Sequence, residues 1–339
     1  MSMRVVSQSE VEKLLPMNEC VDVMREALST LARGDAVLPL RSMMRLPDGS
    51  GLLGLMPGYL GSPKVMGLKV VSVMPGNHGT EYDSHQGAVM IFEVERGCPL
   101  AVIDASSITA IRTAAVSGVA TQTLAKKDAG DLAILGSGTQ AWSHLDAMAT
   151  VCKLRRVRVW SRDKAHARAL VERGAARHGL EVEISDSARD AVEGADLICT
   201  TTAARTPILE AAWLAQGVHI NAVGACFKDT RELDTATVAG ARLYVDRRES
   251  ALNESGEFLI AQAEGVIDEK HIVGELGEVL IGKVPGRASP TERTVFKSLG
   301  IAIEDLAAAH HIWRKAEKLD RGAAIDFGGR RAGVPEAAR

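Results

Sequence analysis

The sequence has little of several features that would point to particular classes of protein. Phe, Trp and Tyr together make up only 4% of its 339 residues, so apolar cores must be built from Ala, Val, Leu, Ile and Met. The N-terminus lacks the apolar core of a signal peptide, and no uninterrupted apolar run is long enough to span a membrane. These absences predict a cytoplasmic protein that has no membrane partner.

Cysteine and charge exclude further classes. The five cysteines are scattered, with no C-x-x-C pair and no metal-ligand spacing, which fits free thiols in a reducing compartment and predicts no metal site. The 40 basic and 43 acidic residues leave a formal charge of −3, so the sequence gives no indication of a nucleic-acid partner. A content of 46% hydrophobic and 24% charged residues is typical of a globular protein.

The first part of the chain, to about residue 118, has the pattern of a mixed α+β domain. Apolar residues at helical spacing predict one helix over residues 9–31, which Gly34 ends. Short apolar runs punctuated by Pro and Gly then predict strands over residues 41–46, 51–56, 67–73, 88–93 and 99–104, followed by a helix over 108–124. Consecutive strands without helices between them indicate an antiparallel sheet or a small barrel.

From Asp131 onward, strands and helices alternate. The strands are expected at residues 132–135, 157–160, 182–184, 197–200, 219–223 and 243–245, with helices over 140–151 and 164–178. Such alternation predicts a parallel sheet covered on both faces. The chain is then expected to be helical over residues 291–299 and 301–319, with a loosely ordered tail from Gly328.

The turn after the first of these strands carries the clearest motif. The strand ending at Leu135 runs into Gly136-Ser137-Gly138-Thr139-Gln140-Ala141, which opens a helix. Gly136 permits the tight turn, Gly138 lets the backbone approach a pyrophosphate, and Ala141 allows close packing of helix and strand. The free N–H groups at the helix N-terminus favour phosphate. This context predicts a Rossmann-type dinucleotide-binding domain.

The residues after the next strand bear on the choice of cofactor. An NAD enzyme of this fold usually has an acid there that bonds the ribose 2′-hydroxyl. This chain has Trp160-Ser161-Arg162, and Asp163 comes too late. A hydroxyl and a guanidinium suit a 2′-phosphate, so the sequence favours NADP(H) over NAD(H), with a solvated Arg162 as the alternative.

Three cations interrupt segments that are otherwise apolar or made of small residues. Arg45 follows two methionines, Lys69 lies within Gly-Leu-Lys-Val-Val, and Arg112 lies within Ile-Thr-Ala-Ile-Arg-Thr-Ala-Ala. A charge in such surroundings is costly unless an anion accompanies it. The anion is either an internal Asp or Glu or the carboxylate of a ligand, and the long side chains can also reach solvent.

Several segments, in order along nearly the whole chain, resemble the ornithine cyclodeaminase/μ-crystallin family. They include Gly67-Leu68-Lys69-Val70-Val71, His85-Gln86-Gly87, the block around Arg112, Asn221-Ala222-Val223-Gly224, residues 275–287 and Phe296-Lys297-Ser298-Leu299-Gly300. The resemblance implies a Rossmann-type, doubly wound α/β domain at residues 119–304. It also implies an α+β domain at 1–118 and 305–339 that binds substrate and pairs two subunits into a homodimer.

The resemblance also implies roles for individual residues. Arg45, Lys69 and Arg112 would hold the carboxylate of a small amino or imino acid, Lys69 would also act on the reacting nitrogen, and His85 is a further candidate for substrate binding. Thr201 and the pair Val223-Gly224 follow predicted strands, where ligands bind in open α/β sheets. The expected cofactor-binding residues are Thr113, Gly136, Gly138, Thr139, Gln140, Ser161, Arg162, Thr201, Val223, Gly224 and Ser298.

One segment separates the activities of this family. Ornithine cyclodeaminases resemble this chain but carry an aspartate after a Gly-Gly pair, where this chain has Gly224-Ala225-Cys226. Asp229 matches instead the Pro-Asp position of the family's reductases, with Lys228 in place of the proline, and is a second catalytic candidate. The favoured reading is therefore a reductase of small 2-imino acids. The alternatives are an ornithine cyclodeaminase, which recycles its cofactor, and a crystallin-like binding protein without turnover.

Overall fold

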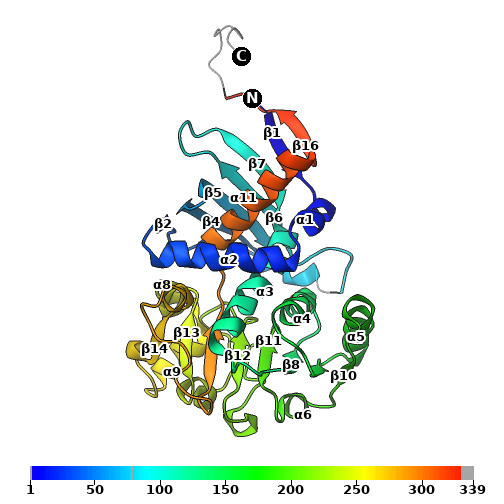
Figure 1. Cartoon of the computed structure of the whole chain (residues 1–339), viewed down its shortest axis with the longest axis vertical. Coiled ribbons are helices and arrows are strands. Elements are labelled where there is room, and N and C mark those ends of the chain that lie inside the picture. The colour runs from blue at the N-terminus through cyan, green and yellow to red at the C-terminus, as the bar shows by residue number, and fades with distance from the viewer. Residues whose placement is uncertain (1, 78, 330–339) are drawn as a thin grey trace. The chain divides into compact units, whose positions relative to one another are not determined.

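The computed structural model of the chain describes residues 2–77 and 79–329 and divides into two compact units (Figure 1). Unit 1 contains residues 1–16, 35–109 and 302–339, and unit 2 contains residues 17–34 and 110–301. The expected boundaries were 118/119 and 304/305. The segment 17–34 groups with unit 2 because its helix α2 (Met17–Ala32) packs against α4 (Thr139–Val151) and α10 (Leu276–Leu280).

Unit 2 is built on a parallel sheet of eight strands in the order β10-β9-β8-β11-β12-β15-β13-β14. This confirms the predicted α/β fold with a doubly wound sheet. Its strands are β8 (Asp131–Leu135), β9 (Arg156–Trp160), β10 (Val182–Ile184), β11 (Leu197–Thr200), β12 (His219–Ala222), β13 (Arg242–Val245), β14 (Ile272–Glu275) and β15 (Thr294–Lys297). Further helices are α3 (Ala105–Leu124), α5 (Lys164–His178), α6 (Ala188–Val192), α7 (Thr235–Ala239), α8 (Arg248–Glu254) and α9 (Gly256–Ala263), with 3₁₀ turns at Ala211–Trp213 and Glu269–His271.

The prediction of a helix over residues 291–299 is wrong. This segment forms β15, which lies between β12 and β13 and is buried along its whole length. Its residues Thr-Val-Phe-Lys include a β-branched pair and an aromatic ring, which suit a strand packed on both faces. A short apolar run does not distinguish a buried strand from a buried helix by periodicity alone, and here the sheet decides.

The prediction of a single helix over residues 9–31 is also corrected. The chain forms α1 (Gln8–Leu14) and α2, which are separated at Leu15 and Pro16. Proline has no N–H to continue a helix and disfavours the helical conformation at the residue before it. Leu15 accordingly has φ −123° and ψ 69°.

Unit 1 is built on an open, mainly antiparallel sheet in the order β16-β1-β7-β6-β5-β4-β2, with β3 also paired to β4. The pairing of β1 with β7 is parallel. The strands are β1 (Ser2–Val6), β2 (Ala36–Val37), β3 (Ser42–Arg45), β4 (Leu52–Gly61), β5 (Lys64–Val73), β6 (His85–Phe92), β7 (Pro99–Asp104) and β16 (Ala323–Asp326), with a 3₁₀ turn at Pro75–Asn77. The sheet is open, which decides between the sheet and the barrel that the sequence left as alternatives.

Helix α11 (Ala302–Leu319) lies across this sheet (Figure 1). Two glycines let it approach closely. A Cβ atom on Gly67 would lie 2.7 Å from Leu306 Cδ2, and one on Gly58 would lie 3.2 Å from Leu306 Cδ1. The face of the sheet that bears Gly58 and Gly67 is therefore the face that α11 covers.

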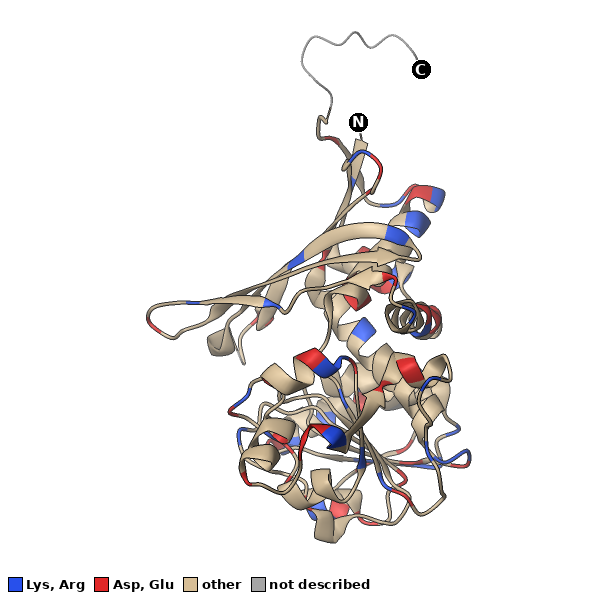
Figure 2. Ribbon diagram, turned by 90° about the vertical axis from the view of Figure 1, so that its left-hand side faces the viewer, with Lys and Arg blue, Asp and Glu red and all other residues tan. Residues whose placement is uncertain are grey.

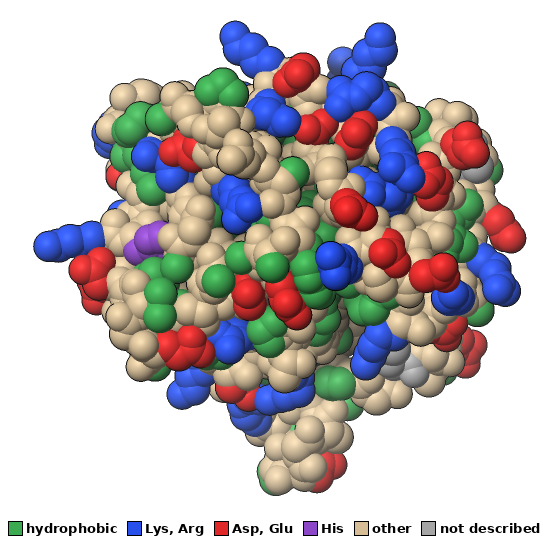
Figure 3. All heavy atoms as spheres, turned by 90° about the horizontal axis from the view of Figure 1, so that it is seen from below, with side chains coloured by type: hydrophobic (Ala, Val, Ile, Leu, Met, Phe, Trp, Pro, Cys, Tyr) green, Lys and Arg blue, Asp and Glu red, His purple; other side chains and the backbone are tan. Residues whose placement is uncertain are grey.

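Charged residues of both signs are distributed over each unit (Figure 2) and are interspersed on the face drawn in Figure 3. In residues 2–77 and 79–329, no helix is long and apolar enough to cross a membrane. No cluster of His, Cys, Asp and Glu that could hold a metal ion occurs within these same ranges. Most of the tail that was expected to be loosely ordered, residues 330–339, lies outside the described residues.

Candidate functional site

The register of the sheet in unit 1 places three predicted substrate residues on one face. Arg45 pairs with Leu52, Leu52 with Val73, and Val73 with His85. Directly paired residues in an antiparallel sheet have their side chains on the same side. Lys69 lies an even number of residues from Val73 along β5, so it shares that side too. Arg45, Lys69 and His85 therefore share the face that α11 covers.

Lys69 is the most buried of these cations. Its side chain is 3% exposed, and its Nζ lies 3.0 Å from Oδ1 of Asp305, which is fully buried in the first turn of α11. The internal carboxylate that the sequence left as one alternative thus exists. The pair keeps a charged amine inside an apolar layer, where an isolated ammonium would be too costly.

Arg45 and His85 lie at the accessible part of the same face. Both side chains are exposed, and His85 Nδ1 lies 3.0 Å from Ser84 Oγ. Partial loss of hydration, followed by the charge of Lys69, lowers the pKa of His85. This unit therefore offers a buried ammonium, an exposed guanidinium and an imidazole whose pKa is lowered.

Arg112, in unit 2, has a different setting from Arg45. Its side chain is buried, and its guanidinium lies against Gly300 at the end of the Phe-Lys-Ser-Leu-Gly block. Gly300 has φ +76°, and a Cβ there would come within 2.7 Å of Arg112 Nη1. The backbone N–H groups of Leu299 and Gly300 donate to Oδ2 of Asp246, at 2.6 and 2.7 Å. Asp246 thereby fixes the turn that holds Arg112 in place.

The glycine turn has the geometry that the motif predicts. Gly136 has φ +127°, and a Cβ on it would lie 2.7 Å from Thr201 Oγ1, so only glycine fits. Gly138 is the N-cap of α4, and open space lies where its Cβ would be. Thr139 and Gln140 form the first turn of that helix. The turn therefore leaves open space beside Gly138 at a helix N-terminus, which suits a pyrophosphate.

A buried carboxylate joins the strand ends next to this turn. Glu232 accepts hydrogen bonds of 2.7 Å from the backbone N–H groups of Thr202 and Gly224 and from the hydroxyls of Thr200 and Thr202. Burial raises the pKa of Glu232. Gly224 has to be small because its Cβ would lie 2.1 Å from Thr202 O. The loops after β11 and β12, which contain Thr201, Val223 and Gly224, are thus held as one rigid edge.

Two predicted cofactor residues present buried hydroxyls that have no partner. Thr113 Oγ1 and Ser298 Oγ are inaccessible to solvent and make no hydrogen bond within the described part of the chain. A buried hydroxyl without a partner is costly, and ligand atoms commonly satisfy it. Together with the open turn at Gly138, these two hydroxyls fit a bound dinucleotide.

Ser161 and Arg162 follow β9 as expected. Ser161 Oγ lies 2.7 Å from Ser137 Oγ of the glycine turn, whereas the Arg162 side chain is exposed. Asp163 turns back to cap the next helix, because its Oδ1 accepts from the backbone N–H of Ala165 at 2.8 Å. Ser161 is therefore tied to the phosphate turn, and Arg162 is free to reach a group placed there.

The segment that distinguishes the family's activities is partly a surface feature. Cys226 is half-buried, with its Sγ 3.5 Å from Val223 O. The carboxylate of Asp229 forms an ion pair of 2.5 Å with Arg205, and both side chains are more than half exposed. Any contact of Asp229 with a substrate amine would have to replace this ion pair.

Sequence reasoning missed the roles of four acids and two cations that hold candidate residues, or the fold of their own unit, in place. Lys297 donates to Ala225 O and pairs with Glu257 at 3.1 Å, and Glu257 accepts from the backbone N–H of Glu232 at 3.0 Å. Burial opposes the charge of Lys297, but Glu257 and its neighbours outweigh this and raise its pKa. Asp246 and Asp305 complete the four acids. For Asp246 and Lys297 the available signal was a charged residue directly after an apolar run, whereas Glu232 and Glu257 lie in polar segments that give no such signal.

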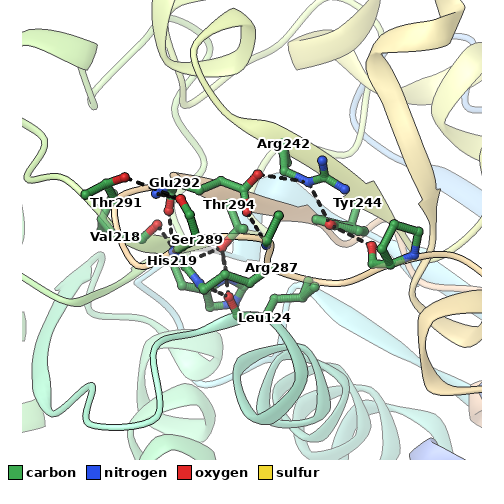
Figure 4. A network of polar contacts seen from close by, with 12 residues as sticks. Leu124, Val218, His219, Arg242, Tyr244, Arg287, Ser289, Thr291, Glu292 and Thr294 are labelled. Atoms are coloured by element: carbon green, nitrogen blue, oxygen red, sulfur yellow. Dashed lines mark hydrogen bonds and ion pairs between the residues drawn. The ribbon is translucent and has the colours of Figure 1, made fainter. Parts of the chain in front are cut away.

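The other missed cation is Arg287 of the Pro-Gly-Arg segment, which is a structural centre (Figure 4). Its guanidinium donates to the carbonyl oxygen of Leu124 at 2.7 Å and to Thr294 Oγ1 at 3.0 Å, and it also bonds the carbonyls of Val218, Ser289 and Glu292. These contacts join the end of α3 to the beginnings of β12 and β15. The conspicuous motif at residues 285–287 therefore serves the fold.

Comparison with known proteins agrees with this geometry. Residues 1–320 match the model of the ornithine cyclodeaminase/mu-crystallin family. Ketimine reductase mu-crystallin of Mus musculus is 41% identical over 280 residues, which cover 83% of this chain and 85% of the mouse protein.

Two solved structures share the whole architecture. Thermococcus litoralis Delta(1)-pyrroline-2-carboxylate reductase, in complex with NADH and L-proline, has a TM-score of 0.93 and 37% identity and covers 95% of this chain and 100% of its own. An archaeal alanine dehydrogenase dimer with bound NAD has a TM-score of 0.91 and 32% identity, covering 97% and 100%. On sequence and on structure alike, the chain belongs to the ornithine cyclodeaminase/mu-crystallin family.

Proposed function

We propose that this protein is an NAD(P)H-dependent reductase of small 2-imino acids. The observation that carries the proposal is Lys69, a buried ammonium on the face that it shares with Arg45 and His85. A fixed cation of this kind suits a substrate that combines a carboxylate with a polar C=N bond. Two relatives support the substrate class, because they are a ketimine reductase and a Delta(1)-pyrroline-2-carboxylate reductase.

In this proposal each residue has a separate task. Arg45 and Arg112 bind the substrate carboxylate, and Lys69 holds the imine nitrogen in its protonated form. A protonated imine is the better hydride acceptor, since its carbon is more electron-poor. When bound, the reduced nicotinamide supplies the hydride that forms the new C–H bond. Asp229 is the candidate for binding the product amine, in exchange for Arg205.

The residues expected to hold the dinucleotide are those of the rigid edge in unit 2. The turn at Gly136 and Gly138, with Thr139 and Gln140, would bind the pyrophosphate. The unsatisfied hydroxyls of Thr113 and Ser298 would donate to the nicotinamide half. Ser161 and Arg162 favour NADP(H), because no carboxylate stands ready for a ribose 2′-hydroxyl at the end of β9.

The decisive experiment follows cofactor consumption. Purified protein is incubated with NADPH and a panel of imino acids, both cyclic (1-pyrroline-2-carboxylate) and linear (2-oxo acids with ammonia), and in parallel with ornithine and a catalytic amount of NAD. A reductase oxidises NADPH in proportion to the imine reduced. Release of ammonia and proline from ornithine, without net NADPH oxidation, would instead identify a cyclodeaminase, and no turnover with any substrate would favour a binding protein.

Cyclodeamination is the less favoured reaction because of Cys226. The carboxylate that would handle the side-chain amine is replaced by a thiol, which is a weaker acid than a carboxyl group. Asp229 does not occupy this position, since it lies three residues further along the chain, where it pairs with Arg205. Turnover of ornithine on the order of 1 per second or faster would overturn the reductase assignment.

A homodimer is proposed from the second face of the unit 1 sheet. Opposite to Lys69, two paired rows of apolar residues remain partly or largely exposed: Leu55, Val70 and Ala88, and Pro57, Leu68, Met90 and Val102. A contiguous apolar face of this kind is typical of a subunit interface, and the related alanine dehydrogenase is a dimer. A monomeric mass in analytical ultracentrifugation would contradict this assembly.

The five free cysteines fit a reducing compartment such as the cytoplasm.

A further inference from the structure

Lys69 and Asp305 form a buried ion pair that joins β5 to the first turn of α11. Their side chains are 3% and 0% exposed, and 3.0 Å separates Nζ from Oδ1. Burial without a partner favours the neutral amine of a lysine, whereas a carboxylate at this distance favours the ammonium. The protonation of Lys69 therefore depends on Asp305.

The strands around Lys69 supply no carboxylate from the residues that pair with it or share its face in this register. Within β4 and β6, the residues paired directly with Lys69 are Met56 and Val89, which carry no charge. His85 on β6 and Arg45 at the end of β3 share its face, and neither can supply negative charge. The acids come from α11, where Glu304 is buried next to Asp305 in the chain and Asp305 lies 3.0 Å from Nζ.

The packing of α11 against β5 positions the carboxylate of Asp305 relative to Lys69. Leu306, the residue after Asp305, lies against Gly67, two residues before Lys69 on β5. A Cβ at Gly67 would lie 2.7 Å from Leu306 Cδ2 and 2.4 Å from Met90 O, so the helix and the strand are closely packed there. A short Asp side chain on this rigid helix then holds Nζ in one place.

We propose that Asp305 is a positioning residue, which keeps Lys69 protonated and aims its ammonium at the imine nitrogen. The inference rests on the proposed function for the reaction that it serves. Asp305 itself need not touch substrate. Its chemical contribution is the charge state and direction of Lys69, and this differs from a purely structural tie between helix and sheet.

The test compares pH profiles of kcat/KM for the imine in the parent protein and in Asp305→Asn, which keeps the shape and loses the charge. We expect a loss of at least about tenfold at neutral pH and an alkaline limb displaced downward by about 1–3 pH units. The substrate's own titration is the same in both proteins, so it cancels. Binding of NADPH should be unchanged. If the profile of Asp305→Asn keeps the parent's alkaline limb, whatever its rate, then Asp305 only links helix and sheet and does not set the protonation of Lys69.

Two further variants keep the test decisive. Asp305→Glu retains the charge and should retain the parent's alkaline limb even if the rate falls, and a limb displaced as far as in the Asn variant would overturn the proposal. Glu317→Gln is the matched control, since Glu317 lies on the same helix but pairs with Arg4 at its exposed end. It should leave the profile unchanged.

A readout without turnover separates this inference from the proposed function. Amine labelling with acetic anhydride at a series of pH values, followed by peptide mass spectrometry, gives the apparent pKa of Lys69, with exposed Lys64 on the same strand as internal control. In Asp305→Asn, Lys69 should become reactive at lower pH while Lys64 does not change. Inactivity of the parent toward all imines would reject the proposed function alone, whereas unchanged labelling of Lys69 would reject the role of Asp305.

Discussion

The two units assemble their candidate site residues in opposite ways. In unit 2, most of the candidate dinucleotide residues come from a turn and from strand ends that parallel topology brings to one edge, so a short motif suffices to find the turn. In unit 1, Arg45, Lys69 and His85 are far apart in sequence and share a face only through the register of three antiparallel pairings. The difference shows that a cofactor site can be read locally, while a substrate site depends on the pairing of strands.

The comparison predicts that substitutions of candidate residues in unit 1 can lower turnover while cofactor binding in unit 2 is kept. Lys69→Met should lower kcat for the imine by about a thousandfold or more, because it removes the ammonium and keeps the volume of the side chain. NADPH affinity should be within about twofold of the parent's, since no cofactor residue changes. Steady-state kinetics and fluorescence titration of NADPH would check both. Near-normal turnover at saturating substrate would contradict the role of Lys69, and lost cofactor binding would contradict the separation.

The same contrast explains what the sequence could predict. Six of the eight strands of unit 2 were predicted from the alternation of strands and helices, and the turn at Gly136 from its motif, because both signals are local. The pairing of Lys69 with Asp305 joins positions in β5 and α11 that no local pattern relates. The clamp of Glu232 on Thr202 and Gly224 likewise depends on a loop that returns to the sheet edge. Residues 291–299 were misassigned because burial in a central strand removes the alternation that marks a strand at a surface.

Arg112 offers the next largest effect and tests the unit 2 contribution to substrate binding. Arg112→Ala should raise KM for the imino acid by about 10- to 100-fold, which corresponds to about 1.5–3 kcal/mol for a charged hydrogen bond. Gly300→Ala should act in the same direction without touching the arginine, since its Cβ would displace the guanidinium. Initial-rate measurements over a range of substrate concentrations decide the matter. Parent-like KM values in both variants would remove Arg112 from the carboxylate site.

Arg162 tests the choice of cofactor in unit 2, because it follows β9 near the glycine turn and its side chain is exposed. We expect the parent to bind NADPH at least about tenfold more tightly than NADH and Arg162→Ala to lose most of that preference, which corresponds to about 1.4 kcal/mol. Arg168→Ala, on the following helix α5 and also exposed, is the control. Titration of both cofactors against each variant measures the ratio. Equal affinities in the parent would show that Ser161 and Arg162 do not read a 2′-phosphate.

The smallest effect concerns acid stability, for which unit 2 has two fully buried histidines and unit 1 has His310, whose pKa burial also lowers to about 4. Unit 2 buries His144 and His219, and burial lowers their pKa values to about 4 and about 3, with the charge of Arg287 adding to the effect on His219. Each unfolded histidine has a pKa of about 6.5 and binds a proton that the folded form refuses.

As the pH falls from about 6.5 toward 4, the free energy of unfolding should therefore drop by about 1.4 kcal/mol per pH unit for each histidine. His144 Nδ1 donates to the carbonyl oxygen of Gln140, and Nε2 of the neutral ring accepts from the Ser117 hydroxyl. His144→Gln can keep polar contacts there without titrating. The unfolding free energy of the His144→Gln protein should fall less steeply as the pH decreases, by up to about 1.4 kcal/mol per pH unit. Urea unfolding followed by the fluorescence of Trp142, Trp160 and Trp213, all in unit 2, gives the slope. The two proteins are compared by the slope of unfolding free energy against pH, because the substitution also changes packing and hence the stability at pH 7. Identical slopes in both proteins would mean that His144 is not a source of acid sensitivity.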